Sequence, residues 1–439
     1  MSAFADRRTR VLDAIGDGVM IVPAAVHALR NSDTEYEYRQ NSDFYYLTGF
    51  TEPEAVLVIA PHAPERFTLF LRQRDRDKEI WNGKRLGVEA AAATLGVDAA
   101  YPIGELAQRL PALIAGTRRA FVQLGADPAF DAVFFSALEA ARSATRRRGF
   151  APDTFVEPGT ILHGMRLRKD AGEVATMRRA AEITRLGHIA GMRATRPGLT
   201  EYELEAIIEY TYRTHGAQGL AYESIVAGGD NATILHYITN RETLQAGRLV
   251  LVDSAAEFDL YASDVTRTWP VSGKFSPEQR AIYAIVLAAQ KAGIDQVRPG
   301  AHARSSHEAA LRVLVEGLIE LGLLSGTVDG AIESEAYKAF YPHSTGHWIG
   351  LDVHDVGGYR LPDGETHQPL EPGMVITVEP GLYVQRDLDC DERFKGIGVR
   401  IEDDVMCGPD GPVNLSPGIP KEIDEIEALV GVDALAAAR

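Results

Sequence analysis

The chain has 439 residues, of which 45% are hydrophobic and 24% charged, and its formal net charge is −17. This length exceeds what one hydrophobic core normally serves, so two domains are expected, and the composition is that of a globular protein. The negative charge argues against a general nucleic-acid binder, because phosphate contact needs clustered Lys and Arg, and no apolar run approaches the roughly 20 residues of a membrane span.

The beginning of the chain, residues 1–10, contains neither an apolar core nor a cleavage-site pattern, so a signal peptide is not predicted. Cys390 and Cys407 are too few for a disulfide framework, and a reducing compartment is the simpler interpretation. We therefore expect a cytoplasmic protein. The one local basic cluster, residues 142–148, is interpreted as the solvated end of a helix.

Strand-like and helical patterns alternate in the first part of the chain. Residues 19–22 (VMIV) and 55–60 (AVLVIA) are short apolar runs bounded by polar turns, which predicts buried strands. Helical patterns occupy residues 86–95, 104–114 and 131–147. This alternation predicts an α/β domain over about residues 1–165.

The second part begins at the polar stretch 167–173 (LRKDAGE), which opens a predicted amphipathic helix that runs to about residue 192. We place the domain boundary just ahead of this stretch, so the second domain covers residues 166–439. Further helices are predicted at 200–215, 276–295 and 304–323, and strand-like runs at 248–258, 261–269, 373–384 and 396–406. Grouped strands and grouped helices predict an α+β domain.

Three carboxylates follow apolar runs of the second domain that should be buried. Asp253 follows LVLV, Glu379 follows MVITV, and Glu402 follows IGVRI. Ionised carboxylates are almost never fully buried without a partner, because desolvation costs several kcal/mol per ion. Arg400 is the only Lys or Arg within these runs, so bound metal ions are the better explanation.

Two further residues complete an oxygen-rich set. Asp264 comes eleven residues after Asp253, across a short polar turn, and this spacing suits two strands of a hairpin. His347 lies in a Gly-containing loop that can direct an imidazole inward. Four carboxylates and one neutral His balance two divalent cations, and such a set suits Mn²⁺, with Co²⁺, Zn²⁺ or Fe²⁺ as alternatives. Two metals about 3.5–4 Å apart can bridge a hydroxide and polarise a carbonyl.

Each of these residues also has an ordinary structural interpretation when it is taken alone. Asp253 could cap a turn, Asp264 could be a surface turn residue, and Glu379, before a Pro-Gly pair, could simply end a strand. An isolated histidine such as His347 is more often packed or hydrogen-bonded than metal-bound. The complete set in this order, within recognisable local sequences, favours the metal site.

The local sequences around the five residues resemble those of the pita-bread metallopeptidases, which include methionine aminopeptidase, prolidase, aminopeptidase P and the non-metal relative creatinase. The resemblance covers about residues 170–439 and is carried by VD at 252–253, SDVTR at 263–267, HSTGH at 343–347, VEPG at 378–381 and VRIE at 399–402. It implies that Asp253 chelates one metal, that Asp264 and Glu402 bridge two, and that His347 and Glu379 complete the second. All five positions carry the expected residue, which argues against a creatinase-like or inactive descendant.

Within this family the chain is most similar to aminopeptidase P, the Xaa-Pro aminopeptidase branch. The similarity is carried by QNSDFYYLTGF at 40–50, EIWNGKRLG at 79–87 and LDVHDVG at 351–357. It implies a creatinase-like α/β domain followed by an α+β pita-bread catalytic domain with a dinuclear metal site. The implied reaction is hydrolysis of the amino-terminal Xaa-Pro bond of peptides. A prolidase restricted to Xaa-Pro dipeptides, or an inactive peptide-binding relative, are the alternatives.

Three further histidines, His236, His343 and His354, are placed around the substrate by the same resemblance. Amide hydrolysis needs donors for the developing oxyanion and for the leaving nitrogen, and histidine can serve both tasks. Glu379 is the candidate general base, with a purely structural ligand as the alternative. As isolated residues, the histidines would be ordinary core or turn residues.

Two more residues are expected close to the metals. Arg400 lies two residues before Glu402, on the same strand face by period-two alternation, so it is expected to anchor that carboxylate. An ordinary buried ion pair is the alternative. Tyr383 is expected to line the pocket and hydrogen-bond near the metals, with a packing role as the alternative.

Trp81 lies in a polar stretch of the first domain. A large aromatic side chain exposed among charges is often an interface anchor, and packing inside its own domain is the alternative. In aminopeptidase P a tryptophan of the matching segment reaches a neighbouring active site. The resemblance therefore implies a homotetramer or dimer, with a first domain that serves oligomerisation and contributes Trp81 to substrate binding. The expected partners are peptides with proline in second position, without nucleic acid or membrane.

Overall fold

A computed structural model of the chain describes residues 2–146 and 149–433. The chain divides into two compact units, Met1–Arg166 and Leu167–Arg439, which meet one residue after the boundary expected from the sequence. The end of the predicted helix 131–147 and the last two residues of the basic cluster 142–148 lie outside the described residues. Within the described ranges no helix is both long and apolar enough to cross a bilayer.

A six-stranded mixed sheet forms the centre of the first unit, with the strand order β6-β5-β4-β1-β7-β8. β4 is antiparallel to both its neighbours, and the other pairs are parallel. The strands are β1 (Val19–Pro23), β4 (Val56–Ile59), β5 (Phe67–Leu71), β6 (Ala99–Pro102), β7 (Arg119–Val122) and β8 (Thr154–Val156). The two predicted strands are β1 and β4. β5, β6, β7 and β8 escaped prediction: β6 and β8 are at most partly buried, whereas β5 and β7 are largely buried apolar runs that the sequence reasoning passed over.

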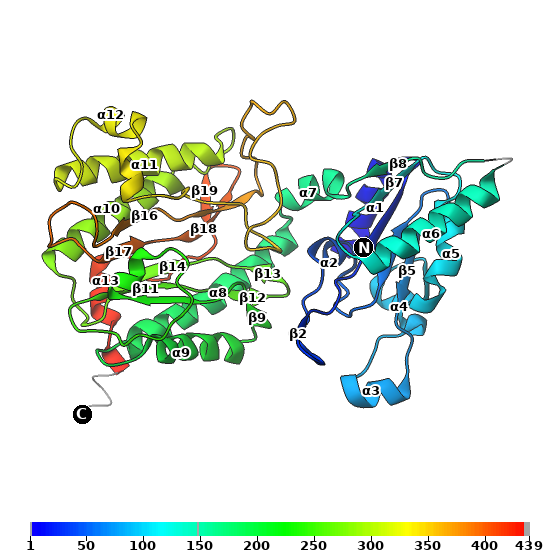
Figure 1. The fold of residues 1–439 in the computed structure, drawn as a ribbon, viewed down its shortest axis with the longest axis horizontal. Helices are drawn as coiled ribbons and strands as arrows, with labels where there is room; N and C mark the ends of the chain where they lie inside the picture. Colours follow the sequence, from blue (N-terminus) through cyan, green and yellow to red (C-terminus); the bar gives the residue numbers. More distant parts are fainter. Residues whose placement is uncertain (1, 147–148, 434–439) are drawn as a thin grey trace. The chain divides into compact units, whose positions relative to one another are not determined.

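Helices flank this sheet and complete its core (Figure 1). They are α1 (Ala3–Ile15), α2 (Ser42–Thr48), α3 (Arg76–Asn82), α4 (Val88–Leu95), α5 (Leu106–Ile114) and α6 (Pro128–Thr145), and a short hairpin pairs β2 (Leu29–Asn31) with β3 (Thr34–Glu35). The three predicted helices are α4, α5 and α6. Leu110 of α5 and Phe134 of α6 are buried against Ile21 and Val58 of the sheet, which forms one hydrophobic core.

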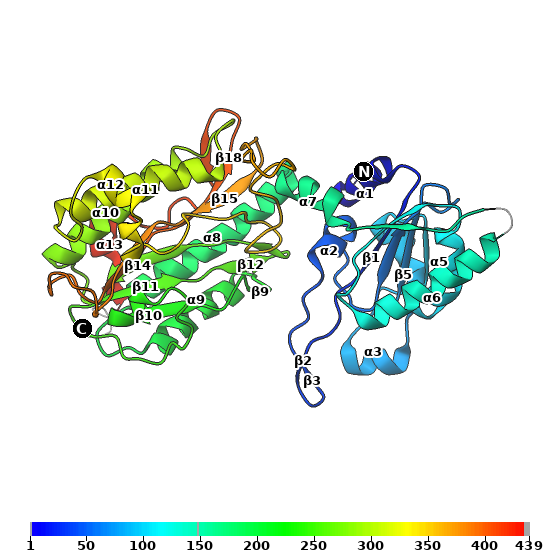
Figure 2. The same cartoon turned by 45° about the horizontal axis from the view of Figure 1, so that its top comes forward.

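The second unit contains long helices on two opposite sides of its strands (Figures 1 and 2). The helices are α8 (Ala171–Ala194), α9 (Glu201–Thr214), α10 (Pro277–Ile294), α11 (Ala303–Glu320), α12 (Val328–Glu333) and α13 (Ile423–Leu429), and α7 (Gly159–Leu167) precedes them. α8 begins at the polar stretch that the sequence singled out, where Asp170 and Glu173 form a capping box. The four helices predicted for this domain correspond to α8, α9, α10 and α11.

The strands of the second unit form several short sheets. The sheets are β10-β11-β14, β13-β12-β9, β15-β18-β19 and β16-β17. The strands are β9 (Gly219–Leu220), β10 (Ile225–Gly228), β11 (Leu249–Asp253), β12 (Ala256–Phe258), β13 (Tyr261–Ala262), β14 (Thr266–Pro270), β15 (Val375–Val378), β16 (Gly381–Val384), β17 (Ile397–Arg400), β18 (Asp403–Cys407) and β19 (Pro412–Asn414). Each of the four predicted strand runs is therefore divided into two strands.

The interruptions fall where the candidate ligands lie. Asp253 ends β11, Asp264 lies between β13 and β14, Glu379 lies between β15 and β16, and Glu402 lies between β17 and β18. A residue outside the regular ladder is released from the strict alternation of side chains, so its carboxylate can turn toward a common point. The predicted hairpin is present, since Asp253 is opposite Thr266 in the antiparallel pair of β11 and β14.

Candidate metal centre and active site

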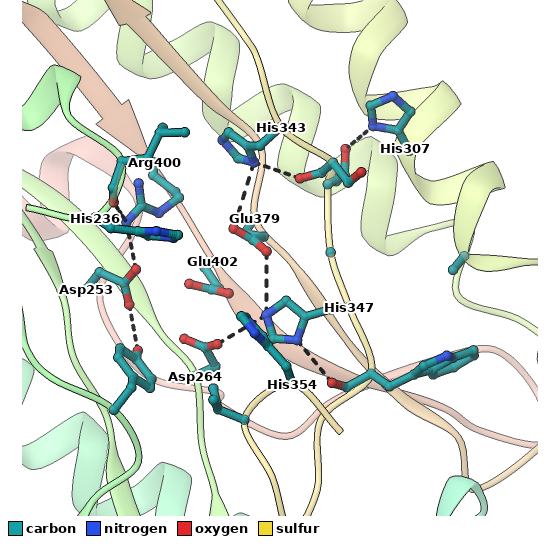
Figure 3. Close-up of a pocket in the computed structure, with 18 of the residues that line it drawn as sticks. His236, Asp253, Asp264, His307, His343, His347, His354, Glu379, Arg400 and Glu402 are labelled. Carbon is teal, nitrogen blue, oxygen red and sulfur yellow. Dashed lines mark hydrogen bonds and ion pairs between the residues drawn. The ribbon is translucent and has the colours of Figure 1, made fainter. Parts of the chain in front are cut away.

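A cavity of about 960 Å³ opens among the strands of the second unit (Figure 3). It is lined by the five candidate ligands and by four of the other residues singled out in the sequence, His236, His343, His354 and Arg400. Tyr383 lies behind this lining. Trp81 belongs to the first unit, on α3, where its side chain is 86% exposed, so it does not pack inside its own domain.

Asp264, His347 and Glu402 form the tightest group of the cavity, with one potential ligand atom of each within 4.8 Å of the others. Nε2 of His347 lies 3.4 Å from Oδ2 of Asp264 and 3.7 Å from Oε1 of Glu379. Nδ1 of His347 lies 3.0 Å from the carbonyl oxygen of Trp348. Because that contact requires Nδ1 to carry the hydrogen, Nε2 is the nitrogen that faces the carboxylates, where it can bind either a proton or a metal ion.

The electrostatics of the group favour a bound cation. Burial raises the pKa of Glu402 well above its ordinary value, and the charges of Asp264 and Glu379 raise it further. Burial likewise raises the pKa of Glu379 to about 7, against the lowering effect of His347. For His347 burial acts to lower the pKa, but the hydrogen bond and charge of Asp264 outweigh it and raise the pKa to about 9. These acids therefore need protons or cations among them, and oxygen donors with one imidazole fit divalent metals.

A hydrogen-bond network extends from Arg400 along one wall of the cavity. Its Nη2 donates to Oδ2 of Asp253 at 2.6 Å, and its Nε donates to Oγ1 of Thr266 at 3.1 Å. Thr266 in turn donates to Oε2 of Glu402 at 2.7 Å. Arg400 is therefore linked to Glu402 through Thr266, and it also forms a buried ion pair with Asp253, the alternative considered from the sequence. The interruption between β17 and β18 ends the period-two alternation, so Arg400 reaches Asp253 instead.

Tyr383 does not line the cavity as expected, because its ring packs among Ile225, Ala227 and Leu251. Its hydroxyl lies 3.1 Å from Nη1 of Arg400 and 2.8 Å from Nε2 of His343. Burial raises the pKa of Tyr383 to about 12, so the hydroxyl keeps its proton at neutral pH. It can accept from Arg400 and donate to His343, and it thereby fixes the histidine that forms the cavity wall.

Two of the pocket histidines, His343 and His354, have different contacts but share a lowered pKa. Burial and the charge of Arg400 lower the pKa of His343 to about 4, and its Nδ1 lies 2.7 Å from the carbonyl oxygen of Ser344. His354 packs edge-on against His347, with 4.3 Å between ring centroids. Burial, followed by the charge of His347, lowers its pKa as well. Both histidines are therefore neutral near pH 7.

A buried ion pair fixes the loop that carries His354. Nζ of Lys169 lies 3.0 Å from Oδ2 of the next residue, Asp355, and both side chains are only 1% exposed. A Cβ at Gly350 would come within 2.2 Å of the same carboxylate, so only glycine fits there. Lys169 thus anchors the loop to the beginning of the catalytic unit.

Two pocket residues escaped the sequence reasoning. Tyr222 donates to Oδ1 of Asp253 at 2.6 Å, and burial, together with the charges of the neighbouring acids, raises its pKa well above the ordinary value. His307 lines the cavity from α11, and its Nδ1 lies 2.9 Å from Oγ1 of Thr345. No local signal marks Tyr222, whose partner is 31 residues away. His307 could have been suspected as the polar residue of a helix face that also carries Ala303 and Ala310.

Comparison with known proteins agrees with this geometry. The sequence model of metallopeptidase family M24 matches residues 175–409, more than half of the chain. The sequence model of the aminopeptidase P amino-terminal domain matches residues 4–122. The chain belongs to metallopeptidase family M24. Its two units match the two parts of the aminopeptidase P architecture, an α/β amino-terminal domain and a pita-bread catalytic domain.

Full-length relatives of the M24 family support the assignment. Xaa-Pro aminopeptidases from Escherichia coli K12 and Haemophilus influenzae are each 43% identical, and the alignments cover 97% of this chain and 97% and 96% of the relatives. Aminopeptidase PepP of Pseudomonas aeruginosa has a solved structure with 47% identity and a TM-score of 0.95, covering 99% of this chain and 98% of that one. The zinc-substituted E. coli aminopeptidase P in complex with product has 42% identity and a TM-score of 0.94, covering 100% and 99%.

Proposed function

We infer that the protein is a metal-dependent Xaa-Pro aminopeptidase, which hydrolyses the bond between an amino-terminal residue and a proline in second position. The observation that carries this function is similarity over nearly the whole chain, including the first unit, to relatives named Xaa-Pro aminopeptidase. Neither alternative, a prolidase or an inactive peptide-binding relative, is favoured by a specific observation.

The proposed ligands of two divalent ions are Asp253, Asp264, His347, Glu379 and Glu402, with Asp264 and Glu402 as bridges. Support comes from the close grouping of Asp264, His347 and Glu402 and from the mutual repulsion of the buried acids. Mn²⁺ is the proposed native metal because the donors are predominantly carboxylate oxygens. When bound, such ions polarise the scissile carbonyl and make the attacking water more acidic.

The proton transfers are assigned to residues of the cavity. Glu379 takes the proton of the attacking water and returns it to the proline nitrogen as the bond breaks. Oε2 of Glu379 lies 4.0 Å from Nδ1 of His343. The proton that Glu379 carries is therefore held next to the cavity wall formed by His343. His354, whose ring nitrogens make no hydrogen bond within the described part of the chain, is the proposed donor to the developing oxyanion.

Recognition of the substrate is assigned to the histidine-rich wall. The ring of proline fixes the φ angle, and the imide nitrogen of a Xaa-Pro bond carries no hydrogen. A site selective for proline therefore contacts the ring and needs no hydrogen-bond acceptor for the imide nitrogen. His236 and His343 line the cavity as imidazole walls for this purpose. The buried network of Arg400 and Tyr383 keeps His343 in place.

Oligomerisation through the first unit is also part of the proposal. Trp81 and Ile80 are 86% and 73% exposed on α3, which carries no buried residue. Two neighbouring large apolar side chains among charged residues are suited to an interface, and we propose that Trp81 completes the substrate site of a neighbouring subunit in a tetramer or dimer. A cytoplasmic location is proposed from the cysteine content.

The test of the function compares two substrates with the Mn²⁺-loaded enzyme, a Xaa-Pro dipeptide and its Xaa-Pro-Yaa extension. We expect cleavage of the first bond of the tripeptide at a rate at least equal to that of the dipeptide. Faster hydrolysis of the dipeptide by about tenfold, a barrier difference of about 1.4 kcal/mol, indicates a prolidase instead. A tripeptide with alanine in second position is the matched control.

A further inference from the structure

His236 depends on its backbone for its position in the cavity. It follows the short 3₁₀ helix η2 (Gly229–Thr233) in the connection between β10 and β11, and its side chain is exposed within the cavity. Among the described residues, its ring makes no hydrogen bond. Whatever holds the surrounding residues 228–242 therefore decides where the imidazole lies.

One buried carboxylate, that of Glu201 at the beginning of α9, gathers donors from this whole segment. Oε1 accepts from the backbone nitrogen of Gly228 at 2.8 Å and from Nδ2 of Asn231 at 3.0 Å. Oε2 accepts from the hydroxyl of Tyr237 at 2.9 Å and from the backbone nitrogen of Glu242 at 2.8 Å. The donors lie on both sides of His236 along the chain, and Glu201 itself is 0% exposed.

The chemistry of these contacts requires a glutamate. All four donors are neutral, and together they give each carboxylate oxygen two hydrogen bonds, which compensates the desolvation of the charge. A glutamine at position 201 would keep one accepting oxygen but place its own NH₂ group against two donors. An aliphatic side chain would leave all four donors without their acceptor, which costs free energy wherever the donor is buried.

Other polar contacts hold the two ends of the segment, and Ala232 between them is packed in a hydrophobic cluster. Asn240 bonds to the backbone of Ser224 and Val226 at 2.7 and 3.0 Å, and Thr200 pairs with Thr243 in an isolated bridge. Near His236 itself, Arg400 reaches the carbonyl oxygen of Leu235 at a long 3.5 Å. The hydrogen bond from Tyr237, the residue directly after His236, is the shorter anchor at this point.

We propose that Glu201 is a positioning residue for the cleavage reaction, which acts through Tyr237 and the backbone of residues 228–242 to hold His236 against the bound peptide. This inference rests on the proposed function. Glu201 is not one of the residues lining the cavity, so its effect on turnover is indirect, and His236 is the polar residue that the segment 228–242 contributes to the lining.

The test is a double-mutant cycle on Xaa-Pro-Yaa cleavage by the Mn²⁺-loaded full chain. Tyr237→Phe keeps the ring, which packs beside Tyr383, and removes only the hydroxyl that bonds to Glu201. We expect it to lower kcat/KM about tenfold in the parent enzyme and by less than about twofold in the His236→Ala background. It should change kcat and KM in the same directions as His236→Ala. Glu201→Gln should give a larger loss, again confined to the enzyme that retains His236.

The matched control is Tyr101→Phe, which removes a tyrosine–glutamate hydrogen bond to Glu65 in the first unit and should leave kcat/KM unchanged. Equal losses from Tyr237→Phe in both backgrounds, or no loss in either, overturn the proposal. Hydrogen exchange of residues 228–242 gives a readout that is independent of activity. Tyr237→Phe should speed exchange there, and unchanged exchange contradicts the proposal. This readout does not depend on peptide cleavage. Failure of the parent enzyme to cleave any Xaa-Pro peptide is a separate outcome, which refutes the proposed function.

Discussion

At the scale of single residues, the centre is defined by acids that cannot all be charged without a cation. The chain places Asp253, Asp264, Glu379 and Glu402 in one cavity, where Arg400 and His347 form ion pairs with members of the set. Arg400 is committed to Asp253. Burial, together with the charge of Asp264, raises the pKa values of Glu379 and Glu402, and the hydrogen bond and charge of Asp264 raise the pKa of His347.

The acids proposed as bridges, Asp264 and Glu402, should therefore matter most for metal content. We expect Glu402→Gln and Asp264→Asn to lose most of both metals after dialysis, because a bridge serves both ions and the amide removes its charge. His343→Asn, a residue outside the proposed ligand set, is the control and should retain nearly full metal. Elemental analysis of each variant measures this. Full metal content in Glu402→Gln, or one metal or none per active parent chain, contradicts the two-metal assignment.

His343 and His354 should affect turnover without affecting metal binding. We expect His→Ala at either position to lower kcat/KM by about 10²–10⁴-fold, the range of lost acid–base or oxyanion donors. Steady-state kinetics at fixed Mn²⁺, with metal content measured on the same samples, provides the check. Substantial metal loss in either variant would place that histidine among the ligands.

At the scale of elements, the four interrupted strand runs separate what could be read from the sequence from what could not. Apolar runs that end in an acid are visible in the sequence, and they indicated three of the candidate ligands, Asp253, Glu379 and Glu402. The interruptions are not visible, because β17 and β18 follow one another along the chain with only two residues, Ile401 and Glu402, between them. Consequently the pairing of Arg400 with Asp253 was not foreseen, and Tyr222, whose contact is set by tertiary packing, was missed.

Helix α8 provides a pH-dependent element of stability. His188 is fully buried, and its Nε2 donates to the carbonyl oxygen of Ser254 at 2.9 Å. Burial lowers its pKa to about 4, below the value of about 6.5 in an unfolded chain. Between these values the unfolded state binds the proton more readily, so stability should fall as the pH drops from about 6.5 to 4 and then level off. The loss is about 3 kcal/mol.

His188→Gln tests this assignment, because an amide can still donate to Ser254 but does not titrate. We expect thermal unfolding of metal-free protein to depend less steeply on pH in this variant than in the parent between pH 6.5 and 4. Metal-free samples are used because acid releases bound metal ions by protonating their ligands, and this release would otherwise change the stability of both proteins. The same slope in both proteins would show that other groups cause the acid sensitivity.

At the scale of the whole molecule, none of the proposed metal ligands belongs to the first unit, yet the family model of the aminopeptidase P amino-terminal domain matches it and the relatives align across it. Its mixed sheet and helices form a separate hydrophobic core, so the unit does not depend on the catalytic core for its fold. Its most conspicuous surface feature is α3, whose Trp81 and Ile80 contact solvent. A large exposed tryptophan is costly to leave in water and is expected to have a partner surface.

Trp81 should therefore connect assembly to activity. We expect the parent to sediment as a dimer or tetramer at micromolar concentration, and we expect Trp81→Ala to lower either the association constant or kcat/KM on Xaa-Pro-Yaa peptides. Tyr210→Ala, which removes a 71% exposed aromatic side chain from α9 of the catalytic unit, is the control and should change neither.

If Trp81 completes a neighbouring site, mixing Trp81→Ala with an inactive Glu379→Ala chain should restore part of the activity, because an intact catalytic centre then receives an intact tryptophan. A monomeric parent with full activity would refute this role and leave Trp81 as an exposed side chain without a catalytic partner.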